Sequence, residues 1–179
     1  GIGRLDLALL TQLPPAPGMA GGGLANALIG TVMVLLVAIA ISVPFGVLGA
    51  LYLSEFDRGG AWARRVRFAT NILSGVPSII AGLFVFGLLV RTGLTGYSAL
   101  AGGASLAVVM LPTILRTAEE ALQLVPQDLR WASLGTGASR LRTVVEVVLP
   151  AAAPPIVTGI SLATARAAGE TAPLIFTAL

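Results

Sequence analysis

The chain has 179 residues, of which 56% are hydrophobic and 11% charged, and its formal net charge is +3. All 11 basic residues are arginine, and lysine, histidine and cysteine are absent. A Walker A loop needs its lysine, and Cys/His zinc sites, Ser-His-Asp triads and disulfides need residues that this sequence lacks. We therefore expect no ATP hydrolysis by this chain, no cofactor and no metal. No basic patch interleaved with aromatic residues supports nucleic-acid binding.

The charged residues are clustered, and long apolar stretches separate the clusters. No charge lies between Asp6 and Glu55, and a bilayer core of about 30 Å needs about 20 apolar residues of helix. After an irregular Pro- and Gly-rich lead-in over 1–23, the pattern predicts one all-α transmembrane bundle occupying residues 1–179. Its spanning helices are expected over 24–53, 68–90, 98–124 and 151–175.

Two polar loops, 55–67 and 126–150, carry most of the arginines. The positive-inside rule places both loops in the cytoplasm, and the two intervening spans make these orientations agree. The second loop predicts two short helices around a glycine hinge, with Asp128 capping the first helix and Ser139 the second. The second helix has an apolar stripe, which predicts that it lies along the membrane surface.

The fourth span contains A-T-A-R-A-A-G-E-T-A-P-L, which places Arg166 and Glu170 one turn apart in an apolar helix. Ionisable groups at that depth are costly and usually face a partner charge or a water-filled path. At this spacing the two side chains form a structural pair, snorkel to the interface or line a translocation path. The planar arginine fork matches tetrahedral oxyanions. Neighbouring Glu119 and Glu120 diverge by about 100° on a helix, so we interpret them as solvated charges.

The loop over 126–150 resembles the E-A-A…G…I-x-L-P loop of ABC importer permeases, with Trp131 where that family usually has glutamate. In the family this loop forms coupling helices that sit in a groove of the ATPase subunit. For Trp131, an interfacial anchor is the alternative interpretation. The resemblance implies that the residues in contact with the ATPase are Trp131, Ala132, Ser133, Gly137, Leu149 and Pro150.

The segments R-A-A-G-E-T-A-P-L, S-G-V-P-S-I-I-A-G-L-F and L-P-T-I-L-R-T-A-E-E-A-L-Q-L-V-P narrow the resemblance to PstA-type permeases of phosphate ABC importers. This implies a MetI-like permease fold of the type I importer kind, multi-pass in a bacterial or archaeal inner membrane. The family has six spans, so we expect the sequence to be an excerpt without the first and last. By the same resemblance, Arg116, Arg166 and Glu170 line the substrate path, although the positive-inside rule alone also explains Arg116.

The resemblance also implies a set of partners. A periplasmic phosphate-binding protein would deliver phosphate to a heterodimer of this chain with a PstC-type permease, driven by a pair of PstB-type ATPases. Sulfate and molybdate remain open as cargo, because arginine does not distinguish tetrahedral oxyanions. A stand-alone secondary carrier or channel would not need the 126–150 loop. An intramembrane aspartyl-type enzyme is excluded within this excerpt, because Glu170 is the one carboxylate predicted deep in a span.

Overall fold

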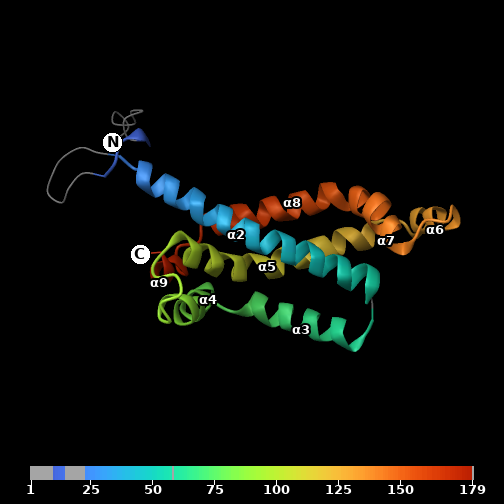
Figure 1. The fold of residues 1–179 in the computed structure, drawn as a ribbon, viewed down its shortest axis with the longest axis horizontal. Coiled ribbons are helices and arrows are strands. Elements are labelled where there is room, and N and C mark those ends of the chain that lie inside the picture. Colours follow the sequence, from blue (N-terminus) through green and yellow to red (C-terminus); the bar gives the residue numbers. More distant parts are fainter. Residues whose placement is uncertain (1–9, 15–22, 58, 179) are drawn as a thin grey trace.

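The computed structural model describes residues 10–14, 23–57 and 59–178, so most of the predicted lead-in lies outside the described residues. Helices dominate this part of the chain and no strand occurs within it, which confirms the all-α prediction. The three long helices α2 (Ala25–Leu51), α5 (Ala99–Leu124) and α8 (Leu149–Ala168) form the bundle (Figure 1).

Shorter elements connect and extend these helices. They are the helices α3 (Ala61–Gly75), α4 (Ser78–Val85), α6 (Gln127–Gly135), α7 (Arg140–Thr143) and α9 (Leu174–Thr177) and the π-helical turns η2 (Tyr52–Phe56), η3 (Phe86–Val90) and η4 (Val144–Val148). The loop with α6 and α7 lies at the same end of the bundle as the turn from α2 to α3, whereas α9 lies at the opposite end (Figure 1). The two arginine-rich loops therefore share one end.

The central element of the bundle is α5, which contacts α2, α3, α4, α8 and α9. In the apolar stretch of α5, 56% of the residues are buried, against 17% in that of α2. Most of the apolar surface of α2 is therefore not covered by other described residues. Two core clusters follow α5 along its length. One joins Leu106, Met110 and Ile114 to α2 and α8, and the other joins Leu122 to Val148.

Close packing of α5 on α2 depends on a glycine. A Cβ atom added to Gly103 would lie 2.4 Å from Cγ1 of Val37 and 3.0 Å from the carbonyl oxygen of Val34. Glycines that permit such approach are common at interfaces between membrane helices. Gly87, in η3, is a natural comparison because a Cβ atom there meets nothing within 4 Å.

We expect Gly103→Ala to lower the free energy of unfolding by about 1–3 kcal/mol, because overpacking forces the two helices apart. For a protein of this size that corresponds to a melting temperature about 5 °C lower, measured by thermal unfolding in detergent. Gly87→Ala is the matched control and should leave the free energy of unfolding unchanged or raise it by up to about 1 kcal/mol, because alanine is the better helix former. Equal melting temperatures for the two variants would contradict the proposed tight contact.

The stretch over 68–90, predicted as one span, is broken in the structure. It is divided between α3 and the continuous helical segment from α4 into η3, and the two parts meet at an angle of 106°. The break falls at Val76 and Pro77: Val76 is extended, with φ −75° and ψ 129°. A residue before proline is pushed out of the α region, and proline offers no N–H to continue the helix. Hydropathy alone does not reveal this break, because the residues on both sides of it are apolar.

The last long helix also differs at both ends from the predicted span over 151–175. Helix continues without interruption from Arg140 to Ala168, so the apolar helix expected along the membrane surface is instead the first part of this longer helix. Within its expected stripe, Val144 and Val148 are buried, while Leu141 and Val145 are exposed. At the other end α8 stops at Ala168, and the chain turns before α9.

Candidate functional site

A cavity of about 410 Å³ lies between the α3–α4 break and α5, close to the end of α8. Its wall is largely apolar, with hydroxyl groups from Ser74, Ser78 and Thr113. Arg166 and Glu170 are the charged residues among those that line it. The structure thus brings the predicted charged pair to a partly open cavity, beside the bend that divides the second apolar stretch.

The pair lies at the end of a helix rather than in its middle. Arg166 is in the last turn of α8, where a cation is favoured by the helix dipole, and Glu170 follows the C-cap residue Gly169. After this turn Pro173 precedes α9, and Gly82 of α4 packs so closely on it that an added Cβ would lie 2.5 Å from its Cα. Helix α4 therefore supports the turn that carries Glu170.

The ion pair itself is loose. Nε of Arg166 lies 3.9 Å from Oε1 of Glu170, and the side chain of Arg166 is 68% exposed whereas that of Glu170 is 21% exposed. Exposed pairs contribute little to stability, with a median of about 0–1 kcal/mol. Arg166 can therefore exchange its contact with Glu170 for another anion at small cost.

The third predicted path residue, Arg116, is not part of this cavity. It is exposed and lines a separate polar hollow of about 270 Å³ between α3 and α5. Thr113, three residues earlier on α5, lines the cavity beside Arg166. Arg116 is thus roughly one helical turn from the cavity, on the side toward the polar loops.

The interpretation of Glu119 as a solvated charge is wrong. Glu119 is 8% exposed, and its Oε1 lies 2.7 Å from a guanidinium nitrogen of Arg67 on α3. Gln123 also donates to this carboxylate, at 3.3 Å. Glu120 is exposed, as expected. The sequence separation of 52 positions between Arg67 and Glu119 explains why helical periodicity did not reveal their pairing.

Of the two short helices predicted in the polar loop, α6 is separate, and the second is the first part of the long segment Arg140–Ala168. Ser139 caps the second, accepting a hydrogen bond from the backbone N–H of Arg142 at 3.3 Å, which confirms that prediction. The prediction that Asp128 caps the first is wrong: α6 begins directly after Pro126 with no side-chain cap, and Asp128 lies in its first turn. At that position the positive end of the helix dipole still stabilises the carboxylate of Asp128.

The residues predicted to contact an ATPase fall into two groups. Trp131, which is 66% exposed, and Ala132 lie on an open surface near Gly137, whose φ of +89° makes the turn after α6. In the other group, Ser133 lies 2.9 Å from the hydroxyl of Thr143 and so joins α6 to α7 within the loop, whereas Leu149 packs on a core cluster of the bundle. Pro150 is exposed at the start of α8.

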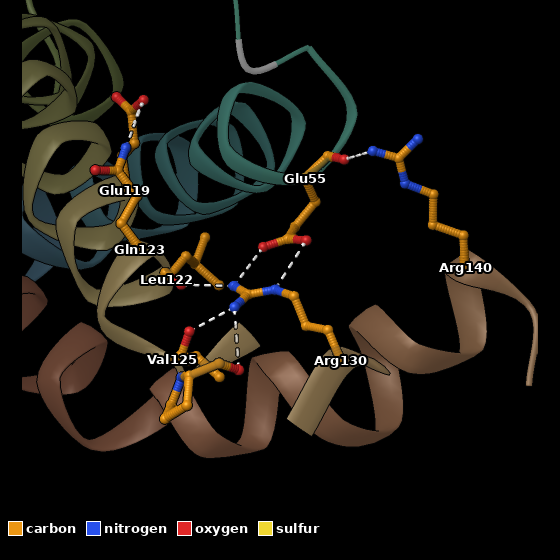
Figure 2. A network of polar contacts seen from close by, with 8 residues as sticks. Glu55, Glu119, Leu122, Gln123, Val125, Arg130 and Arg140 are labelled. Atoms are coloured by element: carbon orange, nitrogen blue, oxygen red, sulfur yellow. Dashed lines mark hydrogen bonds and ion pairs between the residues drawn. The ribbon is translucent and has the colours of Figure 1, made fainter. Parts of the chain in front are cut away.

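A buried charge network at the base of this loop escaped the sequence analysis. The guanidinium of Arg130, in α6, lies 2.8 Å from Oε1 of Glu55, in η2, and the side chains are 7% and 5% exposed (Figure 2). Arg140 donates to the backbone carbonyl of Glu55. The one available signal was an acidic residue in an arginine-rich loop, which does not say which arginine pairs with it.

Within the described residues, three helical segments are long and apolar enough to cross a membrane: Ala25–Phe56, Ala99–Leu124 and Arg140–Ala168. The bent pair Ala61–Gly75 and Ser78–Val90 adds a fourth if it counts as one span. With the polar loops gathered at one end, this arrangement defines a multi-pass membrane protein. Residues 42–179 match the family model described as binding-protein-dependent transport system inner membrane component. The chain belongs to that family.

Relatives and a solved structure agree with this assignment. The phosphate transport system permease protein PstA of Yersinia pestis is 43% identical over 100% of this chain and 60% of its own length. A PstA 1 permease of Mycobacterium tuberculosis is 43% identical over 89% of this chain and 52% of its own length. The chain therefore spans about 60% or less of these two relatives. An inward-facing structure of the MetNI methionine ABC transporter superposes with a TM-score of 0.67 and 26% identity, covering 82% of this chain and 68% of the other.

Proposed function

We propose that this chain is a permease subunit of an ATP-driven phosphate importer in a bacterial inner membrane. The observation that carries the proposal is the 43% identity to the Yersinia pestis phosphate permease, which extends over the whole chain and so includes the cavity and the polar loop. Sulfate and molybdate are the competing cargoes, because all three anions are tetrahedral.

The cavity beside Arg166 is the proposed passage for the anion. An apolar wall gives a phosphate ion few partners, so the guanidinium fork of Arg166 provides the principal attraction. Glu170 competes for the same fork at 3.9 Å and prevents the anion from being held too tightly. A passage needs weak and transient contacts, which leaves selectivity mainly to a periplasmic binding protein.

Energy would enter from a separate ATPase at the loop end. The chain has no lysine for a Walker A loop, and the exposed Trp131, Ala132 and Gly137 provide a surface for a docking partner. We place a PstB-type ATPase dimer there and a PstC-type permease as the second half of the passage. Movement of the loop would tilt the helices and expose the Arg166 region to each side in turn.

The test is reconstitution of the full-length permease with its partner permease, ATPase and binding protein in proteoliposomes. We expect loaded phosphate-binding protein to stimulate ATP turnover and phosphate accumulation together. If sulfate or molybdate, but not phosphate, stimulated ATP turnover and was accumulated, that anion would be the cargo instead of phosphate. Phosphate uptake that continues without ATP or without the loop would instead identify a secondary carrier.

A further inference from the structure

Arg130 makes polar contacts with residues outside the loop over 126–150. Besides the ion pair with Glu55, its guanidinium donates to the carbonyl of Leu122 at 2.8 Å and to the carbonyl of Val125 (Figure 2). Both carbonyls belong to the last turn and C-cap of α5, where the Leu122 carbonyl also accepts from the backbone N–H of Val125 at 3.4 Å. Arg130 thus joins α6 to the end of the central helix of the bundle.

Glu55 makes the corresponding connection to α2. It lies in η2, which continues α2 without a break, and only 4% of its surface is exposed. Its backbone carbonyl accepts from Arg140 of α7, and the guanidinium of Arg140 also lies 5.4 Å from the centre of the Phe56 ring. The ends of α2 and α5 and helix α6 therefore meet at the buried pair Glu55–Arg130, and the exposed Arg140 joins α7 to it from outside.

A second arginine–carboxylate pair in the same loop provides a contrast. Arg142 and Glu146 approach to 2.9 Å, but their side chains are 66% and 57% exposed and they lie one turn apart on one helix. Such a pair stabilises its own helix slightly and connects no separate elements. Burial and connection across elements distinguish Arg130 and Glu55, which are 75 positions apart.

We propose that Arg130 and Glu55 form a rigid joint through which movement of the docked loop reaches α2 and α5. The proposal rests on the proposed function, since it assigns a transmission role within that transporter. Both are positioning residues: neither lines the cavity beside Arg166, and they act by keeping the loop and two long helices in one rigid unit. Arginine is required because its planar fork reaches a carboxylate and two carbonyls at once, which an ammonium group cannot do with the same geometry.

The test compares Arg130→Lys and Glu55→Gln in the complete reconstituted transporter. Arg130→Lys keeps the charge opposite Glu55 and so gives the best chance of normal assembly. We expect both complexes to retain the ATPase subunit and basal ATP turnover, while anion imported per ATP hydrolysed falls at least tenfold. This ratio is counted per assembled complex, so a merely structural role, which lowers yield, leaves it unchanged.

Arg142→Gln is the matched control, and its ratio should equal that of the unaltered transporter. If assembled Arg130→Lys and Glu55→Gln complexes imported as much anion per ATP hydrolysed as the unaltered transporter, the proposed rigid joint would be wrong. Loss of ATPase retention in both variants would also contradict it, since the pair would then serve docking alone. An unaltered transporter that imports a different anion contradicts the proposed function but still permits the ratio to be measured with that anion.

Discussion

Arg166→Gln is expected to reduce phosphate uptake by about 10- to 100-fold, since a hydrogen bond to a charged group contributes about 1.5–3 kcal/mol. Glutamine keeps a polar side chain at the cavity but has neither the positive charge nor the fork that matches an oxyanion. Assembly should be retained, because the side chain of Arg166 is 68% exposed and its pair with Glu170 is 3.9 Å long.

Uptake of radiolabelled phosphate into proteoliposomes, normalised to the amount of assembled complex, measures this effect. Arg91→Gln makes the same chemical change at an exposed residue after η3 that does not line the cavity, and uptake there should be unaltered. Equal loss in both variants would point to overall charge rather than to the cavity. If Arg166→Gln kept full phosphate uptake, Arg166 would not be a residue that binds the anion in the proposed passage.

How far the fold follows from the sequence depends on whether each feature is local. The stretch that forms α2 was evident because an uncharged run of that length has few alternatives to a membrane helix, and the first part of α5, before Arg116, is likewise uncharged. The bend at Pro77 also has a local cause, but averaging hydropathy over a whole span hides it. Proline alone does not mark such a break, because Pro44, Pro112 and Pro155 lie inside continuous helices.

Contacts between distant segments were not accessible in the same way. A helical pattern around Glu119 shows only which neighbours share its face, and its partner Arg67 belongs to another helix. The same holds for Glu55 and Arg130, which belong to the separate elements η2 and α6. The charged pair of the cavity was found because its two members are four residues apart.

Replacing Gly137 by valine should weaken retention of the ATPase subunit about 5- to 30-fold, because a left-handed residue other than glycine costs about 1–2 kcal/mol and valine is especially unfavourable there. Gly137 has a φ of +89°, and a Cβ atom on it would meet nothing within 4 Å. The substitution therefore acts on the backbone of the turn and introduces no clash. The turn would move to another conformation and carry the surface near Trp131 with it.

Gly135→Val separates this backbone effect from the added bulk. Gly135 is also in open space, but it is the last residue of α6 and has no positive φ, so valine is no worse there than glycine. Co-purification of the ATPase with each variant is the measurement, and the expected order is strong loss for Gly137→Val and near-normal retention for Gly135→Val. Equal retention would mean that the partner does not recognise the shape of this turn. Equal loss would mean that the added bulk at this surface matters, whatever the backbone conformation. Only the expected order attributes docking to the left-handed turn that glycine permits.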